Sequence, residues 1–214
     1  VDIFEAAGLD KPNFPILSDE FLAEIRDMKR KNLAIEALNR LLNDQIRIHF
    51  GKNVIRTNDF SKLLSDTLTR YKNGTIEAAQ VIEELIAIAK QIKQASEEGK
   101  VDGLSDDEVA FYDALRVSGG AVEVMGDAQL RELARILVQK VRNNISVDWT
   151  VRANAQARLK VEVKKVLNQY GYPPDQQAIA TDMVLEQAIN YGDDWSSNQN
   201  NYQAADGRGA SLID

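Results

Sequence analysis

The stretch Asp148–Asp175, DWTVRANAQARLKVEVKKVLNQYGYPPD, decides between a sheet and a helical fold for this chain. From Trp149 to Val163 every odd position is apolar, which is the period of a β-strand. A strand of that length would be several times the usual length of about five or six residues. The Ala, Gln, Arg and Lys residues in its middle also prefer helices. We therefore predict a helix of about six turns.

The helical interpretation gives this stretch an apolar stripe and a definite end. Gly171 suits the position after a helix C-terminus, and Pro173–Pro174 prevents continuation and can open the next helix. Two polar residues, Arg152 and Gln156, fall on the apolar side. Either the first turns extend beyond the core, or these two form a buried polar anchor in which a carboxylate from another helix holds the arginine. At steps of three and four, the stripe consists of Trp149, Arg152, Gln156, Leu159, Val163, Val166 and Tyr170.

Capping and turn signals elsewhere predict more helices and no strand. All four prolines lie at positions 12, 15, 173 and 174, so no proline interrupts a helix between them. We predict an all-α fold, a largely antiparallel bundle of about seven helices with a polar C-terminal tail. The other expected helices run from Ser18 to Gly51, from Thr57 or Asn58 to Tyr71, from Thr75 to Ile92, from Ser105 to Leu115 with Glu108 completing a capping box, from Asp127 to Ile145, and from Pro174 to Tyr191.

The helical segments define the expected domain organisation. Residues 1–17 are expected to form a linker or lead-in, residues 18–191 the helical domain, and residues 192–214 a polar tail that is frayed or ordered by a partner. Within the domain, residues 117–126 contain Gly119 and Gly120 and are the expected flexible loop. A start without methionine suggests a piece of a longer protein.

Composition excludes several kinds of chemistry. The 214 residues include no cysteine and one histidine, so disulfides, thiolate sites and multi-histidine metal sites are excluded. The apolar runs are too short to cross a bilayer, and we expect a soluble cytoplasmic protein without membrane contact. No phosphate-binding loop or catalytic motif occurs, and His49 is expected to cap or pack at a helix end. We therefore predict no catalytic, cofactor-binding or metal-binding residue in this chain.

Charge is unevenly distributed along the chain. The formal net charge is −7, which argues against a domain that surrounds nucleic acid. Residues 127–171, however, hold nine Lys or Arg against four acids, whereas residues 172–214 hold seven acids against one Arg. Such patterns usually reflect charge balance on solvated faces, and contact with phosphates or an acidic partner is the alternative. The candidate contact residues are Arg131, Arg135, Lys140, Arg142, Arg158, Lys160, Lys164 and Lys165.

The opening stretch also carries the most specific resemblance. Val-Arg-Ala-Asn-Ala at 151–155, Val-Lys-Lys-Val-Leu at 163–167 and Tyr-Gly-Tyr-Pro-Pro-Asp at 170–175 resemble the C-terminal helical region of the restriction (R) subunit of type I restriction-modification enzymes. Ile-Leu-Ser-Asp-Glu-Phe-Leu at 16–22 and Leu-Ser-Asp-Asp-Glu-Val-Ala-Phe-Tyr-Asp-Ala-Leu at 104–115 agree in order. The resemblance covers roughly residues 1–190.

The resemblance implies a function that the residues alone do not show. R subunits are ATP-dependent DNA translocases and endonucleases, and their motor and nuclease motifs lie N-terminal to this region. The chain would then be a non-catalytic assembly domain that docks the motor onto the methyltransferase core. Its partners would be the methyltransferase and specificity subunits, and ATP and Mg²⁺ would bind only in upstream domains. The alternatives are a DNA-guiding basic surface that contacts double-stranded DNA, or an unrelated all-α scaffold.

Overall fold

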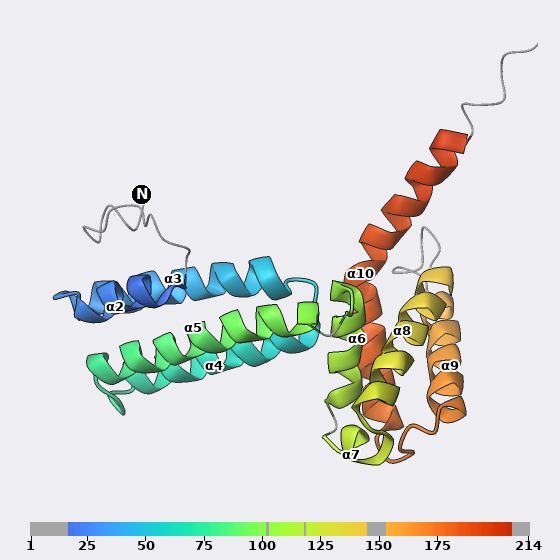
Figure 1. The fold of residues 1–214 in the computed structure, drawn as a ribbon, viewed down its shortest axis with the longest axis horizontal. Coiled ribbons are helices and arrows are strands. Elements are labelled where there is room, and N and C mark those ends of the chain that lie inside the picture. Colours follow the sequence, from blue (N-terminus) through green and yellow to red (C-terminus); the bar gives the residue numbers. More distant parts are fainter. Residues whose placement is uncertain (1–16, 102, 118, 145–152, 207–214) are drawn as a thin grey trace, which may run out of the picture. The chain divides into compact units, whose positions relative to one another are not determined.

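The computed structural model describes residues 17–101, 103–117, 119–144 and 153–206, and all regular structure within them is helical (Figure 1). The predicted all-α class is therefore confirmed. Nine helices are described, where about seven were expected. They fall into two compact units rather than one bundle. The first unit comprises the described residues up to Gly51 and those between Arg56 and Gly103, and the second comprises residues 52–55 and the described residues from Leu104 onward. Among the described residues, no helix is both long and apolar enough to span a membrane.

The first unit is a packed set of helices around α5. Helix α5 contacts both α2 and α3, and its inward residues Ile82, Leu85 and Ile92 are fully buried. Ser18 caps the first helix as predicted, because its hydroxyl accepts a hydrogen bond from the Phe21 N–H at 3.2 Å. The helices of this unit are α2 (Asp19–Asp27), α3 (Lys31–Phe50), α4 (Val54–Lys72, whose first two residues belong to the second unit) and α5 (Ala78–Val101).

The prediction of one helix from Ser18 to Gly51 was wrong. Helix α2 ends at Asp27, since Met28 has an extended ψ of 130° and its N–H bonds back to the Ile25 carbonyl. The Lys31 ammonium donates to the Arg26 carbonyl at 2.6 Å and so satisfies an acceptor at the end of α2. The sequence Met28–Lys31 contains neither Gly nor Pro, and the break therefore has no local signal.

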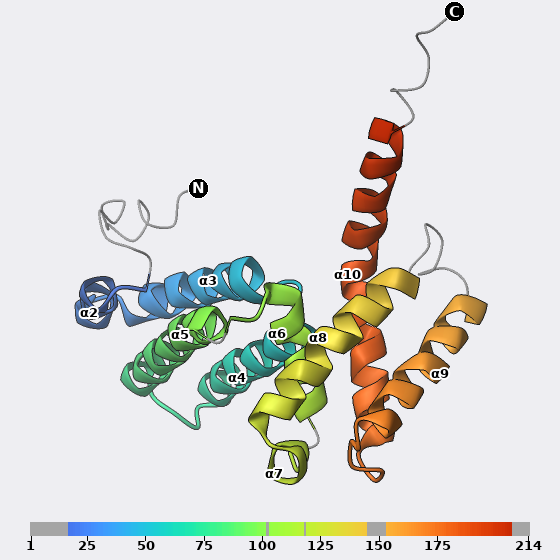
Figure 2. The ribbon, with the colours of Figure 1, turned by 45° about the vertical axis from the view of Figure 1, so that its right-hand side comes forward.

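The second unit is a ring of four helices with a short fifth helix beside it. Helix α6 contacts α8 and α10, α9 contacts the same two helices, and α8 also contacts α10, so each of the four touches at least two others (Figures 1 and 2). The predicted capping box at Ser105 and Glu108 is present, and Gly171 has the left-handed φ of 72° expected after a helix. The helices are α6 (Asp106–Arg116), α7 (Ala121–Met125), α8 (Asp127–Asn144), α9 (Ala153–Gln169) and α10 (Gln177–Asp206).

Two predictions for the second unit need correction. The expected loop at 117–126 contains α7, whose first residue Ala121 is fully buried. The expected end of the last helix at Tyr191 is also wrong, because α10 continues to Asp206. Trp195 explains the continuation: it is buried, stacks on Tyr191 with ring centroids 5.3 Å apart, and lies under the Arg142 guanidinium at 4.9 Å. The free energy gained from this packing exceeds the cost of about 1 kcal/mol of placing a glycine, Gly192, inside a helix.

Buried polar groups attach residues 52–55 to the second unit. The fully buried Gln187 accepts a hydrogen bond from the Val54 N–H at 2.9 Å and donates one to the Lys52 carbonyl. Asn53 donates to the buried Asp113 carboxylate at 2.7 Å. These bonds satisfy backbone and side-chain groups that would otherwise be costly to bury. Side chains from α6 and α10 therefore determine the unit to which this segment belongs.

Substitution of Trp195 tests whether α10 packs beyond Tyr191. We expect Trp195→Ala to lower the free energy of unfolding by about 3 kcal/mol, because it removes a buried aromatic ring and leaves a cavity. Urea denaturation followed by circular dichroism measures the change. Val161→Ala, at an exposed position on α9, is the control and should alter stability by less than about 0.5 kcal/mol. Equal midpoints for Trp195→Ala and the unsubstituted chain would contradict the packing.

Candidate interaction surface

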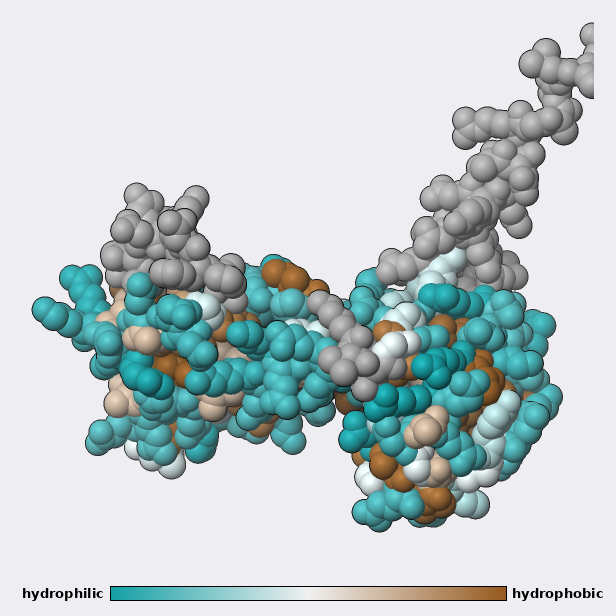
Figure 3. Space-filling view, viewed as in Figure 1, coloured by the Kyte–Doolittle hydropathy of each residue, from teal (hydrophilic) through white to brown (hydrophobic). Residues whose placement is uncertain are grey.

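Large apolar side chains are exposed at one end of the second unit. Val117 follows the last residue of α6, Val124 lies in α7, and Ile179 lies in the first turn of α10. Their exposed fractions are 43%, 69% and 51%. We call these three residues, with the helix ends that carry them, the α7 end. Figure 3 shows hydrophobic surface at the end of this unit where α7 lies. The core-facing residues of the same unit, by contrast, are almost completely buried.

Short-range packing holds the backbone of the α7 end in place. The buried Tyr172 hydroxyl donates to the Leu115 carbonyl at 2.6 Å, which joins the α9–α10 turn to the end of α6. A Cβ on Gly120 would lie 2.5 Å from Nε2 of Gln176, so the start of α7 lies directly against the Gln176 side chain of this turn. Ala121 at the start of α7 is fully buried, whereas Val124, three residues later, is 69% exposed.

A polar cluster joins α6 to the start of α8, the helix that follows α7 in the sequence. The Tyr112 hydroxyl donates to one oxygen of Asp127, and Arg131 donates to the other at 2.6 Å. The Arg116 guanidinium lies 5.1 Å from the centre of the Tyr112 ring. The hydrogen bond from Tyr112, with the charge of Arg131, lowers the pKa of Asp127, whereas burial and the bond to Asp127 raise the pKa of Tyr112. Both groups thus keep the protonation state that this hydrogen bond needs, and the cluster fixes α6 to the start of α8.

The predicted basic residues are mostly engaged with carboxylates. Lys160 of α9 reaches Asp182 of α10 at 2.7 Å, whereas Arg142 of α8 pairs with Asp107 of α6, so these two side chains point to different neighbours. Lys140, Arg158 and Lys164 make no ion pair with a residue that the structure describes. Lys165 and Lys140, from α9 and α8, both lower the pKa of the Glu162 carboxylate, and the contact role of the eight residues remains a prediction. The five ion pairs are Arg131–Asp127, Arg135–Glu132, Arg142–Asp107, Lys160–Asp182 and Lys165–Glu162.

The remaining site predictions are only partly covered by the structure. Arg152 lies outside the described residues, and Gln156 is half-buried on α9, so the polar anchor remains a prediction. His49, expected to cap or pack at a helix end, is exposed near the end of α3, and its Nε2 lies 3.2 Å from the Gln45 side-chain oxygen. Within the described ranges no group of three or more His, Asp or Glu side chains is placed to hold a metal ion.

The α7 end could not be predicted from local sequence. Residues 117–126 contain three glycines, and this composition indicates a loop rather than an anchored helix. The one available signal is the apolar run at 121–125, interrupted only by Glu123, between Gly120 and Gly126. Burial of Ala121 and exposure of Val124 depend on contacts with helices distant in the sequence.

The fold defines an all-helical domain with two separate cores and an exposed apolar end. The chain belongs to the family described as type I restriction enzyme HindI endonuclease subunit-like, C-terminal, whose sequence model matches residues 1–194. The resemblance found in the sequence is thereby confirmed.

Two relatives show how the chain relates to longer proteins. It is 31% identical over 194 residues to the type I restriction enzyme HindI endonuclease subunit of Haemophilus influenzae, covering 91% of this chain and 18% of that protein. It is 36% identical over 172 residues to a putative type I restriction enzyme MjaIXP endonuclease subunit of Methanocaldococcus jannaschii, covering 80% of this chain and 16% of that protein. The chain thus spans less than a fifth of either relative. No solved structure matches the chain significantly.

The depressed pKa of Asp127 predicts a pH-dependent contribution to stability. The folded pKa lies below the ordinary value of 3.8, so the stabilisation is present above that pH and is lost as the pH falls through the folded pKa. We expect Asp127→Asn to be less stable at pH 7, by about 1 kcal/mol or less because the side chain is 45% exposed. The difference from the unsubstituted chain should shrink below about pH 4.

Urea denaturation at several pH values measures this difference. Asp66→Asn is the matched control, because Asp66 is exposed on α4 and makes no ion pair with a described residue. An Asp127→Asn variant whose stability followed the same pH curve as the unsubstituted chain would show that the hydrogen bond from Tyr112 does not stabilise the fold.

Proposed function

We propose that this chain is a non-catalytic assembly domain of the endonuclease subunit of a type I restriction enzyme. In this proposal the α7 end docks the motor and nuclease part of the subunit onto the methyltransferase core. The observation that carries the proposal is that three of the five exposed large apolar residues described in the second unit, Val117, Val124 and Ile179, lie at one end of it; Val161 and Ile189 are the other two. Membership of the family supports the assignment of this domain to the endonuclease subunit of a type I restriction enzyme.

The physical argument concerns the clustering of apolar side chains. Single exposed apolar residues are ordinary on protein surfaces and need no explanation. In this proposal the three residues at one end, on a backbone held by the hydrogen bond from Tyr172 to the Leu115 carbonyl, act as a preorganised apolar surface. Such a surface gains affinity when a partner covers it, because little conformational entropy remains to be lost. The half-buried Val122 and Met125 beside Val124 would extend the contact area.

The small share of each relative that this chain matches supports the proposal that the motor and nuclease lie in other domains. More than four fifths of each relative lies outside the part that matches this chain, which leaves room for motor and nuclease domains there. ATP and Mg²⁺ would then bind in those domains, with the methyltransferase and specificity subunits as the partners and DNA as the substrate of the assembled enzyme. The basic residues of α8 and α9 are a weaker candidate surface, because phosphates would have to displace five existing ion pairs.

A double substitution at the α7 end tests the docking surface. We expect Val117→Asp/Val124→Asp to weaken association with the purified methyltransferase core by about 2 kcal/mol or more, roughly 30-fold, because charge would be buried at an apolar contact. Analytical gel filtration and surface plasmon resonance measure the association. Circular dichroism should show an unchanged fold, since both positions are exposed.

The matched control is Ile48→Asp in the first unit. Ile48 is 67% exposed on α3, almost as much as Val124, but lies outside the α7 end. It should leave the affinity within about threefold of the unsubstituted chain. The proposal fails if the unsubstituted chain does not bind the core at micromolar concentration, or if the two variants lose affinity equally.

A further inference from the structure

The turn between α2 and α3 carries three consecutive cations. Lys29, Arg30 and Lys31, here called the basic turn, line an open hollow of about 640 Å³. Asn32, Leu33 and Glu36 complete its lining, so one acid faces three bases. Helix α3 begins at Lys31 and has no acid in its first turn, and no carboxylate there neutralises the cations. The positive charge at this turn is therefore concentrated, although the whole chain is acidic.

The basic turn differs from the rest of the first unit in its ion pairing. Arg26 pairs with Glu83 at 2.6 Å, Arg47 with Asp44 at 2.8 Å, and Lys90 with Asp19 at 3.3 Å; Arg70 pairs with Glu84. Lys29 and Arg30 are exposed and make no ion pair with any residue in the described part of the chain. The Lys31 ammonium binds the Arg26 carbonyl and has a structural role. Lys29 and Arg30 thus carry charges that no described residue neutralises, and these charges can bind an anion.

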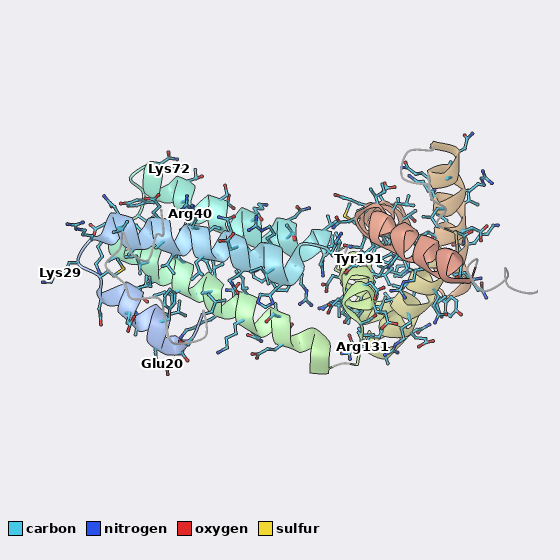
Figure 4. All side chains as sticks on the ribbon, turned by 90° about the horizontal axis from the view of Figure 1, so that it is seen from above. Glu20, Lys29, Arg40, Lys72, Arg131 and Tyr191 are labelled. Atoms are coloured by element: carbon cyan, nitrogen blue, oxygen red, sulfur yellow. The ribbon has the colours of Figure 1, made fainter. Side chains whose placement is uncertain are left out.

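A further cation lies at the same end of the first unit. The Tyr71 hydroxyl donates to the Asn32 side-chain oxygen at 2.7 Å, which brings the end of α4 beside the start of α3. Lys72, the last residue of α4, is exposed, and Figure 4 shows it at the same end of this unit as Lys29. It also makes no ion pair with a described residue. Two separate helix ends therefore contribute to one positively charged surface.

We infer that the basic turn and Lys72 bind the phosphate backbone of duplex DNA. Backbone binding needs cations that replace the counterions of successive phosphates, and it needs no apolar pocket. The hollow suits this requirement, because Leu33 is the one apolar residue among those that line it and is half-buried. A stable contact with an acidic protein is generally anchored by several buried apolar side chains, and Leu33 is the one large apolar side chain that lines this hollow.

The choice of DNA as the polyanion rests on the proposed function, in which the assembled enzyme acts on DNA. The inference goes beyond that function by placing a DNA contact in the first unit, on residues other than the basic residues predicted on α8 and α9. The contact is independent of base sequence, because it uses phosphates alone.

Fluorescence anisotropy with a labelled 30-base-pair duplex of arbitrary sequence tests the inference. We expect the 214-residue chain to bind at low salt, with an affinity that falls steeply as salt rises. Lys29→Glu/Arg30→Glu should weaken binding at least tenfold at low salt and reduce the slope of log K against log salt by about 1.8, for two lost phosphate contacts. The substituted acids lie at the start of α3, where the helix dipole favours them, so the fold should persist.

The charge-matched control is Lys62→Glu/Lys93→Glu. Both lysines are exposed on helices of the first unit, outside the basic turn, and the change in net charge is the same. This variant should bind DNA within about threefold of the unsubstituted chain. Absence of binding at low salt, equal losses in the two variants, or full binding by Lys29→Glu/Arg30→Glu would each overturn the inference.

Association with the methyltransferase core, measured without DNA, separates this inference from the proposed function. Lys29→Glu/Arg30→Glu should leave that association unchanged. A loss of core binding with unchanged DNA binding would overturn the inference and assign the basic turn to a protein contact. Failure of the α7-end variants to affect core binding would refute the docking proposal, and the DNA result would still stand.

Discussion

Shared burial of apolar stripes is the constraint on which both units depend. Each helix exposes an apolar side that it cannot bury alone, and stability follows only when several helices cover one another. In the first unit α5 fulfils this role, with Val81, Leu85 and Ala89 completely buried. In the second unit the ring of α6, α8, α9 and α10 encloses Phe111, Leu130 and Leu167. Because each set closes on its own core, the chain forms two units.

Local chemistry explains which helix boundaries could be predicted. Ser105 with Glu108 and Gly171 mark their helix ends through hydrogen bonds and backbone conformation that involve only neighbouring residues. The break at Met28 and the continuation of α10 past Gly192 had no such signal. The first involves the Lys31 side chain, and the second depends on Trp195 packing against Arg142, more than fifty residues earlier. The division into two cores likewise depends on contacts that no local pattern encodes.

The predicted basic contact residues show even more clearly what the local sequence cannot predict. Counting charges along residues 127–171 identified a basic stretch, but it could not identify the carboxylates that neutralise it. Arg142 pairs with Asp107, thirty-five residues earlier, and Lys160 pairs with Asp182, twenty-two residues later. Lys29 and Arg30 are the opposite case, because a carboxylate lies near them in the sequence but does not pair with them in the structure. Their sequence neighbours include Asp27, yet neither forms an ion pair with it, and their free charge became evident only from the structure.

The two proposed surfaces differ in the physics of recognition. The α7 end offers fixed apolar groups, whose affinity comes from excluding water and depends little on salt. The basic turn offers flexible cations, whose affinity comes from counterion release and falls as salt rises. The two surfaces also belong to units with separate cores. Substitutions at exposed positions in one unit should therefore act independently of those in the other, since energetic coupling requires shared contacts. The salt dependence of each association can thus identify which surface carries it, even within one polypeptide.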